Sequence, residues 1–151
     1  MASDREPITE RPLPSAALAS TLRTSVLRLG RRLRRHAPAD LTPAQMSALA
    51  TVRRDPGITL SGLAAHERVQ PPTMTRVVDA LVAKDLVERS VCADDRRVSR
   101  LRATDAGREL VDSVRRRRDA YLASRLAALT DEERAVLARA ATLLDRLGEG
   151  S

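Results

Sequence analysis

Apolar residues recur at intervals of three and four along several segments of the chain, which is the spacing of one face of an α-helix. The longest such stripe lies in residues 15–37 and consists of Leu18, Leu22, Val26, Leu29 and Leu33. Arginines occupy many of the positions around it. The stripe is longer than the neighbouring short segments can cover, so it predicts a helix that packs against another long helix.

The following segments carry clear signals for two short helices. Thr42 and Gln45 form a capping box, with a proline at the first helical position between them. This helix is expected to end at residues 55–57, Asp-Pro-Gly. Thr59 then caps a second helix, which is expected to bury Leu63.

A third helix, predicted over residues 70–84, has an apolar stripe and a polar outward face. Its first turn contains two prolines, which fit where backbone N–H groups lack partners. The stripe consists of Met74, Val78 and Leu81, and the outward positions are Thr73, Thr75, Arg76 and Asp79. A short helix, a tight turn and a second helix that begins with polar and arginine residues are typical of a helix-turn-helix, here over residues 59–84.

The segment after this helix predicts two antiparallel strands. Residues 86–91 are short and apolar enough for one strand, and residues 98–103 alternate between arginines and small or apolar side chains. The turn between them is charged. The predicted fold is therefore mainly α with a small β wing, a winged helix-turn-helix over residues 41–104.

Two motifs in this region resemble one family. The run Pro-Pro-Thr-Met-Thr-Arg-Val-Val-Asp-Ala-Leu-Val-Ala-Lys-Asp-Leu-Val-Glu-Arg, residues 71–89, resembles the recognition helix and first wing strand of the MarR family of transcriptional regulators. Asp95-Arg96-Arg97, with Thr104 and Gly107 at the family's spacing, is similar to its wing signature. The resemblance covers roughly residues 15–147. It implies a DNA-binding homodimer with interlocked terminal helices.

The chain departs from that family's pattern at four positions in and just after the helix-turn-helix. Gly62 stands where an acidic residue is usual, Glu67 where a hydrophobic residue is usual, and Arg68 where glycine is usual. A positive φ at a residue with a Cβ costs roughly 1 kcal/mol, so either the turn differs locally or this cost is accepted. Asp85 replaces a glycine in the left-handed conformation, which Asp tolerates.

The terminal segments suggest a dimer. Helices starting at Thr104 and at a Thr130 capping box carry further apolar positions, unrelated to the winged helix. The economical way to cover these stripes is a second copy of the chain, since twofold dimers are the commonest oligomers. We therefore expect dimerisation helices over residues 15–37 and 104–147, in a domain of residues 15–147. Residues 1–14, with three prolines, are expected to form a mobile arm.

Charge and composition favour double-stranded DNA as the partner. The net charge is +7 and the pI about 11.1, which suits a polyanion, although codon usage alone could also enrich arginine in a chain whose only lysine is Lys84. Aromatic residues make up 1%, which argues against binding single strands by base stacking. The arginine run 115–118 is interpreted as a solvated helix face, with a DNA-backbone contact or an acidic partner in the other subunit as alternatives.

No catalytic, metal or cofactor site is predicted. His36 and His66 lack partners at zinc-site spacing, and no phosphate-binding glycine loop or nucleophile elbow occurs. Cys92 is the only cysteine, so an intrachain disulfide is excluded. Its basic neighbours could lower a thiol pKa, which leaves redox sensing as an alternative. No apolar run reaches the ~20 residues of a membrane span and no signal region is evident, so we expect a cytoplasmic protein without membrane contact.

The sequence therefore predicts a transcriptional regulator and not an enzyme. The resemblance implies a repressor that responds to a small-molecule effector and binds a pseudo-palindromic operator as a homodimer. The alternatives are an architectural protein that binds DNA without sequence preference, and a winged helix used for protein–protein contact. The candidate DNA-contacting residues are Ser61, Gln70, Pro72, Thr73, Thr75, Arg76, Asp95, Arg96 and Arg97.

Overall fold

The computed structural model describes residues 14–36, 40–91 and 99–148. All but the last residue of the expected mobile arm, and the turn of the wing, lie outside these ranges. The elements in chain order are α1 (Ser15–His36), α2 (Pro43–Arg54), α3 (Leu60–His66), α4 (Pro71–Ala83), β1 (Val87–Val91), β2 (Ser99–Ala103), α5 (Asp105–Leu126) and α6 (Asp131–Gly148). This order confirms the predicted fold class, helices with one small two-stranded wing.

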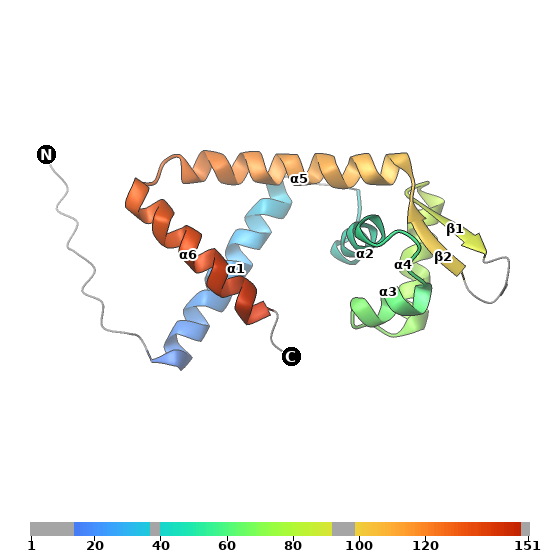
Figure 1. Ribbon diagram of the computed structural model, residues 1–151, viewed down its shortest axis with the longest axis horizontal. Coiled ribbons are helices and arrows are strands. Elements are labelled where there is room, and N and C mark those ends of the chain that lie inside the picture. The colour runs from blue at the N-terminus through green and yellow to red at the C-terminus, as the bar shows by residue number, and fades with distance from the viewer. Residues whose placement is uncertain (1–13, 37–39, 92–98, 149–151) are drawn as a thin grey trace, which may run out of the picture.

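Helices α2, α3 and α4 form one lobe with the two strands, and long α5 leads away from it towards α1 and α6 (Figure 1). The core of the protein lies in this lobe. Its largest fully buried side chains are Leu49, Leu63, Leu81, Leu101, Val52, Val78 and Val87. The predicted inner faces of α3, α4 and β2 thus meet in one cluster. Since the core is aliphatic, the lobe is stabilised mainly by burial of apolar surface from five different elements.

The wing strands pair antiparallel, with Val87 opposite Ala103 and Val91 opposite Ser99. The predicted alternation is confirmed, because Leu101 and Ala103 are buried. A third segment also pairs with β2: the Leu101 N–H donates to the Ile58 carbonyl at 2.9 Å. One isolated antiparallel bridge, between Thr59 and Arg100, forms here. The wing is therefore attached to the segment that begins α3.

Predicted caps begin four of the helices. Side-chain oxygens of Thr42, Thr59, Thr104 and Thr130 accept backbone N–H groups of the following turns, and Thr42 and Thr130 form complete capping boxes. Asp85 has φ 54°, as expected where glycine is usual. At Gly107 a Cβ would lie 2.1 Å from the Leu86 carbonyl oxygen, so glycine allows α5 to cross the start of the wing closely.

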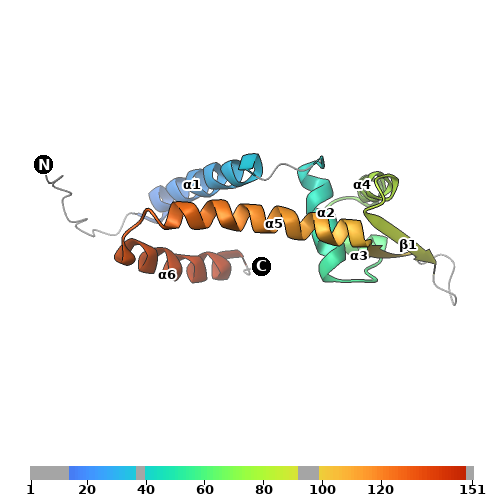
Figure 2. The same cartoon turned by 90° about the horizontal axis from the view of Figure 1, so that it is seen from above.

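The terminal helices are much less covered than the lobe. α1 packs against α5, yet neither α1 nor α6 contains a buried residue. The two helices cross in Figure 1, but Figure 2 shows them on opposite sides of α5. Leu22 and Leu33 are half-buried, so part of the α1 stripe is covered within the chain. The exposed apolar side chains of these two helices are Leu18, Val26, Leu27, Leu29, Val136, Leu137, Leu143, Leu144 and Leu147.

Candidate DNA-binding surface

The position of α4 is fixed by its apolar side. Met74, Val78 and Leu81 are all at most 2% exposed and belong to the core cluster. The helix begins at Pro71, preceded by Gln70, whose side chain makes no capping hydrogen bond. Because the buried side chains are one turn apart along the helix, the opposite face of α4 points away from the lobe.

That opposite face is accessible at the start of α4. Gln70, Pro72, Thr73 and Arg76 are exposed. Arg76 has no ion pair or hydrogen bond within the part of the chain that the structure describes, so its guanidinium is available for a ligand. Thr75 is half-buried, and its hydroxyl donates to the Pro71 carbonyl at 3.0 Å. Its remaining hydrogen-bonding capacity is as an acceptor.

The other candidate residues lie elsewhere. Ser61 is exposed at the start of α3, with its hydroxyl 3.1 Å from that of Thr59. The structure brings it into the same helix-turn-helix as α4. Asp95, Arg96 and Arg97, and with them Cys92, lie outside the described residues, so their predicted positions at the wing remain predictions.

The turn between α3 and α4 contains a strained residue. Arg68 has φ 55°, the left-handed region that glycine occupies without cost. Its N–H donates to the Ala65 carbonyl at 3.1 Å, and the Val69 N–H donates to the Ala64 carbonyl at 3.0 Å. These two bonds form a Schellman motif, which needs that backbone conformation. Of the two alternatives posed by the sequence, the turn keeps its usual geometry and the steric cost is accepted.

Glu67, next to this strained residue, is held by side chains of α2. Its Oε2 accepts a hydrogen bond from the Ser47 hydroxyl at 2.7 Å, and its Oε1 accepts one from the Thr51 hydroxyl at 2.8 Å. His66 Nδ1 lies 3.3 Å from Oε1, and an Arg54 nitrogen lies 2.7 Å from His66 Nε2. Because arginine can only donate, a hydrogen bond from Arg54 requires His66 Nε2 to accept, which leaves Nδ1–H to donate to the Glu67 carboxylate.

The pKa of Glu67 reflects this environment. Burial raises it, but the hydrogen bonds from Ser47, Thr51 and His66 outweigh burial and hold the pKa below its ordinary value. Glu67 is therefore ionised at neutral pH. A lowered pKa in the folded state stabilises the fold above the unfolded-state pKa, and this stabilisation is lost only as the pH falls through the lowered value.

An ion pair joins the outward side of α4 to the wing. An Arg89 nitrogen on β1 lies 2.6 Å from Asp79 Oδ1 on α4. Sequence reasoning placed Asp79 on the outward face but did not single out Arg89 or Glu67 as contributors to the surface. Glu67 could have been found from the sequence, because it departs from the family pattern. For Arg89 no signal existed, because the pairing depends on how the strand crosses the helix.

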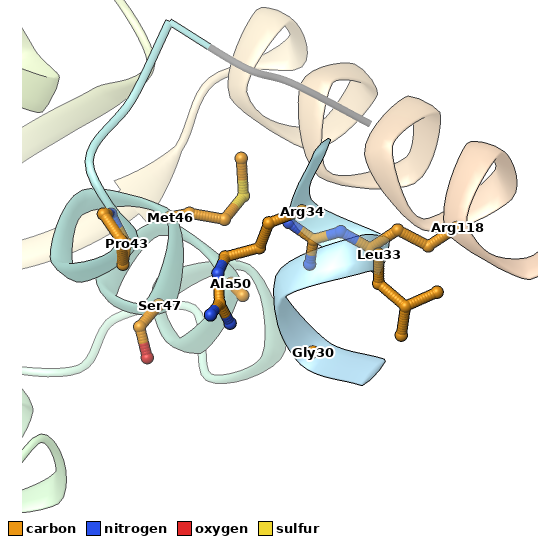
Figure 3. Close-up of a pocket in the computed structure, with 8 residues that line it drawn as sticks. All are labelled: Gly30, Leu33, Arg34, Pro43, Met46, Ser47, Ala50 and Arg118. Carbon is orange, nitrogen blue, oxygen red and sulfur yellow. The ribbon is translucent and has the colours of Figure 1, made fainter. Parts of the chain in front are cut away.

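A cavity of about 350 Å³ lies on another side of the lobe, between α1, α2 and α5 (Figure 3). Leu33 and Met46 contribute apolar wall, Ser47 a hydroxyl, and Arg34 and Arg118 two guanidinium groups. The Nε atom of Arg118 is buried and has no hydrogen-bond partner in the described part of the chain. Such a donor is costly to leave unpaired, which makes this opening a candidate site for an acceptor-bearing ligand.

The arginine run of α5 divides between two environments. Arg115 pairs with Asp119 at 3.7 Å and Arg116 with Glu109 at 2.6 Å, both on an exposed face. These two fit the solvated-face interpretation. Arg118 does not fit that interpretation, because its side chain lines the cavity.

Comparison with known proteins identifies the family. The MarR family model matches residues 41–99. An HTH-type transcriptional regulator of Mycobacterium tuberculosis is 41% identical over 130 residues, which cover 85% of this chain and 91% of the relative. The chain belongs to the MarR family. It is a helix-turn-helix, DNA-binding transcriptional regulator by family and by the names of its relatives, which describe regulators and not enzymes.

Two further likenesses extend the picture. The HTH-type transcriptional repressor MdtR of Bacillus subtilis is 36% identical over 93 residues, covering 62% of this chain and 60% of the repressor. A crystal structure of a transcriptional regulator protein from Pseudomonas aeruginosa is 35% identical, covers 90% of this chain and 97% of its own, and superposes with a TM-score of 0.80. The arrangement of terminal helices and winged helix is therefore shared over nearly the whole chain.

No helix in the described ranges is both long and apolar enough to cross a membrane. Among the same residues, no three His, Cys, Asp or Glu side chains come together in a way that could hold a metal ion.

Proposed function

We propose that this MarR-family protein is a sequence-specific repressor that binds a pseudo-palindromic operator as a homodimer in the cytoplasm. The observation that carries the proposal is α4: its stripe Met74, Val78 and Leu81 is buried, while the side chains of Thr73 and Arg76 are exposed in its first half and have no partner among the described residues. In a helix-turn-helix the second helix enters the major groove, and its N-terminal residues contact base edges. A helix that is fixed by its buried apolar side and has exposed polar side chains at that end meets this requirement.

The proposal of a homodimer is based on the apolar side chains that are exposed on α1 and α6. Leu144 is 40%, Leu143 55% and Leu147 71% exposed on α6, and Val26 is 50% exposed on α1. Contiguous apolar side chains of this size mark interaction surfaces in soluble proteins. A second copy of the chain supplies the same two stripes, and a twofold interface pairs each surface with its equivalent. The two α4 helices then face successive major grooves, roughly 34 Å apart.

The direct test of this proposal is selection of bound duplexes from a random pool by the full-length protein. The expected product is an inverted repeat. Recovery of duplexes with no shared sequence would support an architectural protein, and failure to bind duplex DNA at low salt would support a protein–protein role for the winged helix.

We propose that the wing contributes through Asp95, Arg96 and Arg97, in keeping with the family's wing signature. Arg97 would enter the minor groove, which attracts cations more than it distinguishes bases. Arg97→Ala should weaken binding to the selected duplex and to random duplexes alike, and reduce the salt slope by about one contact per subunit. Salt titrations measure this, and an unchanged Arg97→Ala removes the wing from the interface.

Asp95→Ala provides the opposing comparison. Loss of a negative charge alone would tighten binding to DNA. If Asp95 instead orders the turn around the arginine by a charge-assisted hydrogen bond, binding weakens despite the charge gain. The same salt titrations separate the two outcomes, and tighter binding would exclude the ordering role.

Repression of transcription, as opposed to activation, is supported by the likeness to the repressor MdtR. Release by an effector is supported by the cavity, whose two guanidinium groups suit an anion such as an aromatic carboxylate. Ser47 lies in the cavity wall and also donates to Glu67 in the turn before α4. A ligand that draws on Ser47 therefore acts on a side chain that helps to hold the recognition helix.

Salicylate is a suitable probe of the cavity. It is expected to weaken binding to the selected duplex in the wild type, and Arg118→Ala should raise the half-effective salicylate concentration about tenfold, as expected for loss of a charged hydrogen bond. Arg117→Ala is the matched control, since Arg117 does not line the cavity. Equal salicylate responses of Arg118→Ala and the wild type would contradict the assignment.

A further inference from the structure

Two adjacent residues that depart from the family pattern, Glu67 and Arg68, together form the turn before α4. Arg68 is in a left-handed conformation that a residue with a Cβ adopts only under strain. Such a residue persists when its surroundings over-determine its conformation. The restraint therefore has to come from the neighbouring contacts, and the hydrogen bonds of Glu67 are the ones that leave the turn and reach another helix.

The geometry of these bonds leaves the Glu67 carboxylate little freedom. Each oxygen accepts from a different hydroxyl, and the two donors, Ser47 and Thr51, are one helical turn apart on α2. Thr51 is itself 5% exposed, and its neighbours Leu49 and Val52 are fully buried in the core. The carboxylate is thus tied to a part of α2 that cannot shift without disturbing the core.

The three polar side chains also depend on one another. An apolar residue at position 67, as is usual in the family, would leave the buried Thr51 hydroxyl without its carboxylate partner. The donors on α2 and the acceptor in the turn therefore form one matched set. Arg54 and His66 extend it along the outer edge of α2 and α3.

We propose that Glu67 is a positioning residue for DNA recognition: its carboxylate holds the strained turn on α2 and thereby sets where the start of α4 meets the major groove. This rests on the proposed function, because it concerns the placement of Thr73 and Arg76. Among the described residues, the hydrogen bonds of Glu67 go to Ser47, Thr51 and His66, and none goes to Thr73 or Arg76. The effect on DNA is transmitted through the backbone of residues 67–71, which leads directly into the first turn of α4.

Electrostatics and positioning predict opposite results for Glu67→Gln. The substitution removes a negative charge beside a DNA-binding helix, so charge alone would tighten binding to every duplex. Loss of position instead weakens binding where base contacts matter, in the selected duplex, and leaves random duplexes nearly unaffected. The informative quantity is therefore the ratio of the Kd for random duplex to the Kd for selected duplex.

The experiment measures this ratio for full-length variants by fluorescence anisotropy, at a temperature where circular dichroism shows each variant folded. Glu67→Gln should lower the ratio about tenfold, the equivalent of ~1.4 kcal/mol. Ser47→Ala and Thr51→Val, which keep the carboxylate and remove one donor each, should lower it in the same direction by smaller factors. Glu109→Gln, the same change on the exposed face of α5, should leave it unchanged.

Rescue distinguishes positioning from general destabilisation. In the double variant Glu67→Gln with Arg68→Gly, glycine adopts the left-handed conformation without strain, so the turn no longer needs the carboxylate to hold it. The ratio should therefore recover towards the wild-type value. A ratio that is unchanged or raised in Glu67→Gln would overturn the proposal, as would a lowered ratio that Arg68→Gly leaves uncorrected. If the wild type itself shows no preference for any duplex, it is the proposed function that fails.

Discussion

Replacing Leu144 with Asp is expected to convert the protein into monomers and to abolish tight binding to its operator. Leu144 is 40% exposed in the single chain and lies in the apolar stripe of α6. In the proposed dimer this stripe is covered, so the substitution would bury an unpaired carboxylate in an apolar seam. We expect the dimer dissociation constant to rise by at least about a thousandfold, or ~4 kcal/mol.

Leu144 is a better choice for this test than Leu22 on α1. Leu22 is half-buried within its own chain, so a charge there would also damage the subunit. Thr142→Asp is the matched control, because Thr142 is exposed on the opposite side of α6 and the new charge stays in water. Sedimentation equilibrium at micromolar concentration reads out the result. A well-folded wild-type monomer, or a Leu144→Asp variant that stays dimeric, would show that the stripes have another purpose.

Replacing Arg76 with Ala is expected to remove base preference at one position of each half-site. Arg76 is exposed and unpaired within the described chain, on the outward side of the first half of α4. A bidentate pair with guanine contributes ~1–3 kcal/mol of discrimination, and a dimer makes the contact twice. Preference for the selected duplex over one substituted at both positions should therefore fall by roughly a hundredfold or more.

Competition binding with the two duplexes measures the loss. Arg102→Ala is the control, since it removes the same charge from an exposed position on β2 and should not change the preference. Should Arg76→Ala bind both duplexes more weakly by the same factor, Arg76 contacts a phosphate, and base recognition passes to Thr73 and its neighbours.

Local signals in the sequence were sufficient for the helices and the wing. The stripe Met74, Val78 and Leu81 is buried as predicted, because a helix in a small lobe has one place to put its apolar side. The threonine caps are equally local, since each depends only on residues within one turn of itself. Arg68 and Asp85 adopt the positive φ that the family pattern suggested, although neither is glycine.

The contacts between elements could not be predicted in the same way. The set of Ser47, Thr51 and Glu67 joins residues up to 20 positions apart, and no local sequence pattern links the three. The cavity beside Arg118 depends on the angle at which α1 meets α2 and α5, which no stripe specifies. Likewise, the stripes on α1 and α6 indicated burial against other helices. How much of that burial occurs within one chain depends on how α1 packs on α5, which the stripes do not specify.

Ser47 links the cavity to the turn between α3 and α4, and this link is a physical route by which an effector could regulate DNA binding. Ser47 has one hydroxyl hydrogen to donate, and in the structure it donates to Glu67. An anion held by Arg34 and Arg118 would compete for that same donor. Effector binding and operator binding would then be coupled through one side chain, and by linkage each would weaken the other to the same extent.

Methylation protection of guanine N7 on the selected duplex tests the central claim most directly, because N7 is exposed in the major groove. A dimer that places one α4 in each of two successive major grooves should protect two symmetric groups of guanines, centred about one helical turn apart. In the Arg76→Ala variant, protection should be lost in both groups at once. A single protected group, or strong binding without any protected guanine, would contradict paired major-groove recognition by α4.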